Sequence, residues 1–219
     1  MSQTTFQRNS VTGVQLEKEK PLAPIIEGFV LPLTEAQREM WLGTQMGPPA
    51  SAAHNESCIV SLDGRFELEA MRRAIETVVN RHEALRATFS PQGEYQQFSP
   101  SASVEMPLLD LSRLEAMLRD AELHDLLTEG RQSFDLVNGP LFSFRIIRVE
   151  EDRHLLVFTV HHIACDGWSY DIVLRELGSL YSSNVKQESS LGRCSSVSMP
   201  AGNKSRNGAL KELLLRSSG

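Results

Sequence analysis

The chain is short of the residues that mark several protein classes. It has only three cysteines, Cys58, Cys165 and Cys194, and no Cys-x-x-Cys pair, which excludes a disulfide framework and the usual zinc spacings. No apolar run approaches the ~20 residues of a membrane-spanning helix, and the polar N-terminus lacks the apolar segment of a secretory signal. Acidic residues outnumber basic ones, 28 to 22, whereas a nucleic-acid-binding surface needs clustered Lys and Arg. We therefore expect a cytoplasmic protein that binds no nucleic acid, membrane or metal.

Charge and composition divide the chain into three parts. Residues 182–219 carry six Lys or Arg and two Glu, a charge of +4. Because the whole chain has a net charge of −6, residues 1–181 carry −10. Ten of these 38 residues are serine, a composition typical of disordered segments. We predict an N-terminal linker over 1–27, a folded unit over 28–181, and a disordered, serine-rich basic tail over 182–219.

Apolar periodicity within the folded unit predicts mixed secondary structure. Thr34 is suited to cap the first helix, and Met71, Ile75 and Val79 recur at helical spacing. Helices are expected over 35–44, 68–82, 114–132 and 171–181, and strands over 54–62, 85–89, 94–98, 141–149 and 154–160. This order predicts an α/β fold, a two-layer mixed sheet with flanking helices.

The chemistry concentrates in residues 160–169, VHHIACDGWS, where the last predicted strand ends. Neighbouring side chains of a strand point to opposite faces, so only one of the two histidines can face a cleft, which argues against a metal site. Asp166 has two interpretations: it caps the following helix, or it is a buried carboxylate that requires an arginine partner. Gly167 would permit a positive φ and a close approach by a substrate. Cys165 is interpreted as a core residue.

Four segments, in this order, resemble motifs of one family. Residues 33–42, LTEAQREMWL, are similar to its first motif. Residues 80–89, NRHEALRATF, resemble RHExLRTxF and depart from it only at Ala87. Residues 134–141 contain FDL followed by GPL, and residues 160–169 resemble the HHxxxDG active-site motif. By this resemblance the chain is identified as a member of the condensation domains of nonribosomal peptide synthetases, in the chloramphenicol acetyltransferase-like superfamily.

The resemblance implies a role for each site residue. His162, the second histidine, would face the tunnel in which two substrates meet, and it would act either as a base or by positioning the amine. Gly167 would offer its backbone N–H to the thioester carbonyl. Asp166 would be structural and paired with Arg86. The other structural residues of the implied site are His161, Arg81 and Trp168.

The implied reaction is peptide bond formation between substrates held on the phosphopantetheine arms of carrier domains, with no cofactor bound directly. The implied partners are peptidyl or acyl carrier domains, the C-terminal lobe of a condensation domain and neighbouring synthetase modules. Because the resemblance spans 28–181, it covers only the N-terminal lobe, and we expect a truncated chain with weak or no activity alone. Two alternatives stay open: an acyltransferase that uses acyl-coenzyme A, and a non-catalytic remnant or interaction module.

Overall fold

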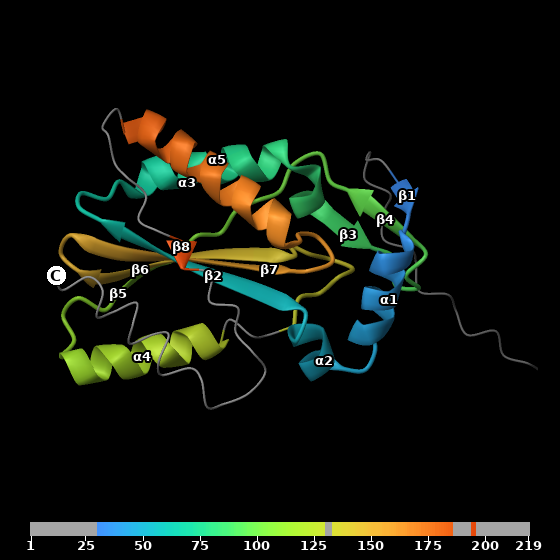
Figure 1. Ribbon diagram of the computed structural model, residues 1–219, viewed down its shortest axis with the longest axis horizontal. Helices are drawn as coiled ribbons and strands as arrows, with labels where there is room; N and C mark the ends of the chain where they lie inside the picture. Colours follow the sequence, from blue (N-terminus) through green and yellow to red (C-terminus); the bar gives the residue numbers. More distant parts are fainter. Residues whose placement is uncertain (1–29, 130–132, 186–193, 196–219) are drawn as a thin grey trace, which may run out of the picture.

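The computed structural model describes residues 30–129, 133–185 and 194–195. The predicted linker over 1–27 and most of the predicted tail lie outside the described residues. The rest forms two sheets with helices packed around them (Figure 1). The predicted α/β class, a mixed sheet with flanking helices, is confirmed.

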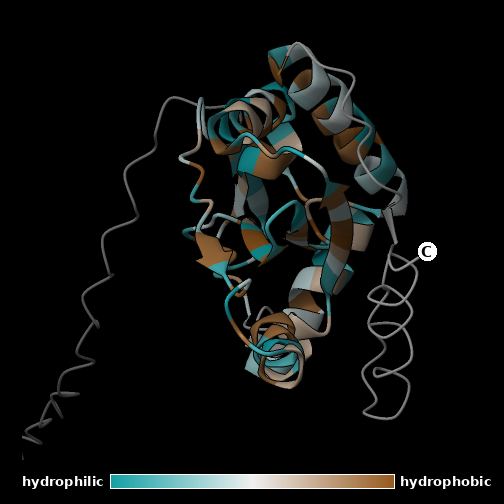
Figure 2. Cartoon of the chain, turned by 90° about the vertical axis from the view of Figure 1, so that its left-hand side faces the viewer, coloured by the Kyte–Doolittle hydropathy of each residue, from teal (hydrophilic) through white to brown (hydrophobic). Residues whose placement is uncertain are grey.

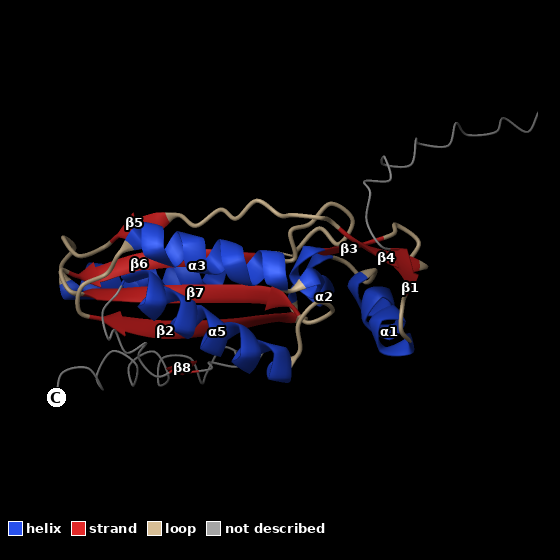
Figure 3. Ribbon diagram, turned by 90° about the horizontal axis from the view of Figure 1, so that it is seen from above, coloured by secondary structure: helices blue, strands red, loops and turns tan. Residues whose placement is uncertain are grey.

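The larger sheet has the strand order β5-β6-β7-β2-β8. Only β5 runs parallel to its neighbour, β6, and all other pairs are antiparallel. Strand β7 lies in the centre of the sheet, and all nine of its residues are buried (Figure 3). The strands are β2 (Asn55–Asp63), β5 (Leu108–Asp110), β6 (Phe142–Glu150), β7 (Arg153–His161) and β8 (Cys194–Ser195).

Helices cover both faces of this sheet, as the view along the strands in Figure 2 shows. Helices α3 (Leu68–Arg81) and α5 (Gly167–Val185) lie side by side on one face, and α4 (Ala116–Glu129) lies on the other. Because successive strand residues alternate between faces, each strand contributes to two cores. A central strand between two helical layers must therefore be apolar on both sides, as the run 155–158, LLVF, is.

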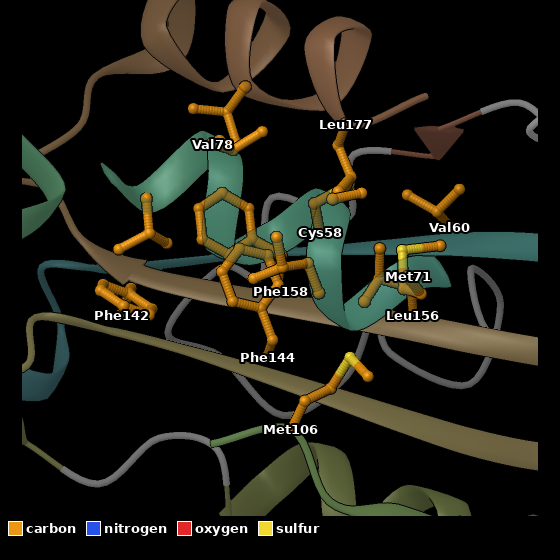
Figure 4. Packing of buried hydrophobic residues seen from close by; sticks show 14 of the residues in the cluster. Cys58, Val60, Met71, Val78, Met106, Phe142, Phe144, Leu156, Phe158 and Leu177 are labelled. Carbon is orange, nitrogen blue, oxygen red and sulfur yellow. The ribbon is translucent and has the colours of Figure 1, made fainter. Parts of the chain in front are cut away.

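The core beneath α3 and α5 is built around stacked aromatic rings (Figure 4). The rings of Phe144 and Phe158 lie 4.5 Å apart and are nearly parallel, at 6°. Met71 of α3 and Leu177 of α5 belong to the same cluster, and both are buried. On the opposite face, Leu123 and Leu127 of α4 pack against Ile59, Ile147, Leu155 and Val157.

The smaller sheet lies beyond the end of β7 and has the order β1-β4-β3. Its strands are β1 (Val30–Pro32), β3 (Ala87–Phe89) and β4 (Tyr95–Phe98), and helices α1 (Glu35–Thr44) and α2 (Pro48–Ala52) connect it to β2. Thr34 caps α1 as predicted, in a capping box with Gln37. The Gln37 side chain also exchanges hydrogen bonds of 3.0 and 3.1 Å with Gln96, which attach α1 to β4.

Several predicted boundaries are corrected by the structure. The strand expected over 85–89 begins only at Ala87, because a 3₁₀ turn, Glu83–Arg86, precedes it. Strands β1 and β5 and helix α2 were not predicted, since elements of three to five residues show no periodicity. Helix α5 starts at Gly167 rather than at residue 171, and it continues to Val185, past the expected domain end at 181.

Candidate active site

The end of β7 is held in place by backbone hydrogen bonds on both sides. The N–H of His161 donates to Leu141 O at 2.9 Å, and the N–H of His162 donates to His54 O at 2.8 Å. The N–H of Ala164 then donates back to His161 O at 3.0 Å, which turns the chain toward α5. The two histidines therefore sit on a rigid strand end, and their side chains diverge.

His161 is the buried member of the pair, with no measurable exposure. Its Nδ1 accepts a hydrogen bond from the Ile163 N–H at 3.2 Å, which places the ring proton on Nε2. Burial, followed by the proximity of His54 and His162, lowers the pKa of His161 to about 4. At neutral pH this imidazole is uncharged and is part of the packed structure.

His162 faces outward, and its side chain is 36% exposed. Its Nδ1 lies 2.8 Å from Oε1 of Glu56 on β2. Sequence reasoning missed Glu56. A charged residue near the start of the strand predicted over 54–62 was a visible signal, but its neighbour across the sheet depends on strand register, which the sequence alone does not reveal.

Asp166 caps helix α5, which agrees with the first of its two interpretations. Its Oδ1 accepts hydrogen bonds from the Ser169 hydroxyl at 2.7 Å and from the Ser169 N–H at 2.9 Å. These bonds, with a smaller contribution from nearby His162, hold the pKa of the exposed Asp166 carboxyl below its ordinary value. The capped helix begins immediately after the motif and fixes the loop that follows the histidines.

The predicted ion pair between Arg86 and Asp166 is wrong. Arg86 donates instead to three backbone carbonyl groups: to Val79 O and Asn80 O at 3.2 Å each, and to Ser99 O. The physical reason is local: the last carbonyls of α3 have no partner within the helix, and the guanidinium offers five donors in a planar fork. Arg86 thus attaches the end of α3 to the chain that leaves β4.

Arg81 forms a different link, between α3 and α5. Its Nη1 lies 3.2 Å from Oε2 of Glu176, and Nε2 of His82 lies 3.0 Å from the same oxygen. The His82 hydrogen bond and the charge of Arg81 lower the pKa of Glu176. This cluster joins the two helices that cover one face of the sheet.

Gly167 and Trp168 differ from what was expected. Gly167 is the first residue of α5 and does not have a positive φ, yet a Cβ atom built on it would meet nothing within 4 Å. Open space therefore lies beside its Cα atom. Trp168 is 82% exposed, so its indole does not pack within the described part of the chain as a structural residue would.

Cys165 is confirmed as a core residue. Its side chain is buried, and burial, together with the negative charges of Asp166 and Glu56, raises the pKa of the thiol to about 12. Such a thiol carries almost no thiolate at neutral pH and is a poor nucleophile. Of the side chains in residues 161–166, the partly exposed imidazole of His162 is thus a more accessible candidate than the Cys165 thiol.

Metal binding would require a cluster of ligand side chains, and membrane insertion would require a long apolar helix. Among the described residues, no three His, Cys, Asp or Glu side chains converge as the ligands of a metal ion would. Within the same part of the chain, no helix combines the length and the apolar character needed to cross a membrane.

Curated proteins that are similar to this chain include synthases and synthetases of much greater length. The chain is 38% identical over 164 residues to the chondramide synthase of Chondromyces crocatus, which is 74% of this chain and 4% of that protein. It is 35% identical over 153 residues to the malpibaldin synthetase of Mortierella alpina, covering 69% of this chain and 3% of that protein. The chain thus spans a few per cent of the length of these relatives.

Solved structures of related domains have the same fold. The starter condensation domain of the rhizomide synthetase RzmA matches with a TM-score of 0.66 at 24% identity, over 72% of this chain and 40% of that one. The cyclization-docking bidomain of EpoB from Sorangium cellulosum matches with a TM-score of 0.62 at 26% identity, over 74% of this chain and 32% of that one. The matched region is therefore less than half of each solved chain.

A family model described as "Condensation domain" matches residues 28–196. This range contains both sheets, the helices between them and the whole histidine loop. The chain therefore belongs to the condensation-domain family of nonribosomal peptide synthetases.

Proposed function

We propose that this chain forms one wall of a peptide-bond-forming active site, with His162 as its catalytic residue. The observation that supports this most directly is the contrast between the two adjacent histidines. His161 is buried and has a pKa lowered to about 4, whereas His162 is partly exposed beside a carboxylate at the sheet end. Only His162 is therefore accessible to a substrate.

The proposed reaction joins two substrates that are carried as thioesters on the phosphopantetheine arms of carrier domains. The amine nitrogen of the acceptor attacks the thioester carbonyl carbon of the donor, forming the C–N bond. His162 takes the proton that the nitrogen loses, or positions the amine for attack. The C–S bond then breaks, and the sulfur leaves as a thiol after it receives a proton, so atoms and charge balance.

The beginning of α5 is suited to receive the donor carbonyl. The first amide groups of a helix have no acceptor within the helix, and they carry a partial positive charge. The Gly167 N–H is one of them, and Gly167 has no side chain of its own that could cover it; open space lies where a Cβ would stand. It is therefore available to the oxygen on which negative charge develops during attack.

The exposed apolar surface near this site supports the view that another part of a condensation domain covers it. Trp168 and Ile172 are 82% and 46% exposed, and they lie one turn apart at the start of α5. Leu42 of α1 and Met46 just after it are also exposed, and α1 lies toward the same end of the larger sheet as the start of α5 (Figure 1). Large apolar side chains left exposed in this way are typical of surfaces that bind another protein or domain.

The test is peptide bond formation between loaded donor and acceptor carrier proteins. The wild-type chain, His162→Ala and the control His124→Ala on α4 are assayed alone and with the separately expressed C-terminal part of a related condensation domain. We expect product only in the complemented reactions, and a decrease of roughly 10²–10⁴-fold for His162→Ala but not for the control.

Two results would overturn the proposal in different ways. Turnover of acyl-coenzyme A without carrier proteins would identify a free-standing acyltransferase. Binding of carrier proteins with no product in any combination would identify an interaction module that retains the fold without the activity.

A further inference from the structure

We infer that Glu56 is a positioning residue for His162: its carboxylate holds the imidazole in the tautomer with the proton on Nδ1, so that Nε2 is left to face the attacking amine. This inference rests on the proposed function for its catalytic meaning. Its structural part, the orientation and tautomer of the ring, stands on the geometry of the chain itself.

The contact is short, and it selects one ring nitrogen. Oε1 of Glu56 lies 2.8 Å from Nδ1 of His162. The two atoms are not aligned as a hydrogen bond, but a carboxylate oxygen at this distance repels a lone pair on Nδ1 and therefore favours a proton on that nitrogen. A neutral imidazole has a single ring proton, and Nε2 then presents a lone pair, which is the atom that a base in this site needs.

Hydrogen bonds that do not involve the Glu56–His162 contact hold the backbones of both residues in place. Glu56 is paired with Val160 across the sheet, and its backbone oxygen accepts a hydrogen bond from the hydroxyl of Tyr170. Tyr170 is buried in α5, with its ring 5.0 Å from that of Phe158. The His162 N–H donates to the backbone oxygen of His54, the residue directly before β2. Only the side-chain torsions of Glu56 and His162 therefore remain to be ordered.

Among the charged groups near the His162 ring, Glu56 is the one placed to stabilise a protonated imidazole. Asp166 lies close enough to interact electrostatically with His162, but its Oδ1 is occupied by the two hydrogen bonds from Ser169. His161 and Cys165 are neutral at neutral pH, since their pKa values are about 4 and about 12. When His162 accepts a proton at Nε2, the adjacent carboxylate of Glu56 compensates the new positive charge.

A purely structural role does not account for this pair. The side chains of Glu56 and His162 are 40% and 36% exposed, and ion pairs with this degree of exposure contribute little to stability. Removing the Glu56 carboxylate should therefore leave the fold intact and alter the ring. This makes Glu56→Ala an informative variant, and Glu122→Ala, an exposed position on α4 across the sheet, a matched control.

The first measurement is the tautomer of His162, read from the ring ¹⁵N chemical shifts of the labelled chain at pH 8.5, where a free imidazole is neutral. We expect the Nδ1–H form in the wild type and in Glu122→Ala, and a shift toward the Nε2–H form in Glu56→Ala. The same tautomer in the wild type and Glu56→Ala, with both folded by circular dichroism, would overturn the inference. This measurement needs no carrier protein and no turnover.

The second measurement connects the ring to catalysis in the complemented carrier-protein assay. We expect Glu56→Ala to lower kcat by roughly five- to tenfold, with KM for the acceptor unchanged. In the background of His162→Ala, the same change should cost nothing more, because the two residues act as a unit. A raised KM with unchanged kcat would instead assign Glu56 to substrate binding and overturn the positioning role.

The two measurements separate failure of the inference from failure of the proposed function. If no variant forms product, peptide bond formation is refuted, while the tautomer comparison still decides whether Glu56 orients His162. If product forms and the tautomer does not depend on Glu56, the proposed function stands and the positioning role is refuted.

Discussion

Replacing His161 by asparagine should remove a pH-dependent loss of stability. The pKa of His161 is lowered from 6.5 to about 4 in the folded chain, so below pH 6.5 the unfolded state binds a proton that the folded state does not. The free energy of unfolding therefore falls as pH decreases from about 6.5 to 4, by about 3 kcal/mol in total. Between pH 7.5 and 5.0 the expected loss is about 2 kcal/mol.

Asparagine is suited to this test because its side-chain oxygen can accept the Ile163 N–H in place of Nδ1 and does not titrate. Urea unfolding would be measured at pH 7.5 and 5.0 for the wild type and for His161→Asn. The variant is expected to be less stable than the wild type at both pH values, because it leaves space in the core. Its free energy of unfolding should, however, fall by about 2 kcal/mol less than that of the wild type between pH 7.5 and 5.0.

His154 also has a pKa lowered by burial and by Arg148, but it is present in both proteins and its effect cancels. The window lies above the range in which most carboxyl groups titrate. Equal losses in the wild type and the variant would show that the folded chain does not hold His161 neutral, and the reasoning from burial would be refuted.

Three further predictions concern the core and the loop. Phe158→Ala removes a ring stacked on Phe144 and should lower the free energy of unfolding by about 3–5 kcal/mol; a loss under about 1 kcal/mol in urea titration would contradict this packing. Asp166→Ala removes the cap of α5 and should cost about 1 kcal/mol, whereas Asp166→Asn should retain most of it; equal melting temperatures for all three proteins would argue against the cap. Gly167→Ala meets no steric obstacle, so circular dichroism and melting should match the wild type while kcat of the complemented domain falls; an unchanged kcat would show that no substrate approaches this backbone.

Long elements with a clear apolar period could be predicted from the sequence. The helix of residues 68–81 and the hairpin before the histidines agree with their predicted ranges to within one or two residues. The capping of α1 by Thr34 also follows from local chemistry alone. Three-residue strands such as β1 and β5 depend on partners distant in sequence, and no local pattern indicates them.

The candidate site could be predicted only in part from the sequence, for the same reason. Adjacent histidines on a strand must face opposite sides, and the structure has one buried and the other exposed. The sequence did not identify Glu56, because its contact with His162 depends on the register between β2 and β7. It also suggested a long-range partner for Arg86, where nearby backbone carbonyls offer a closer one.

The central position of β7 makes the identity of the accessible histidine sensitive to insertions and deletions. Strand residues alternate between faces, so deleting one residue within β7 would move His162 into the buried position of His161 without changing either amino acid. The turn of residues 151–152, at the opposite end of the hairpin, can absorb added residues because it lies outside the paired strands. Length variation among relatives is thus expected in that turn and not within the nine residues of the strand.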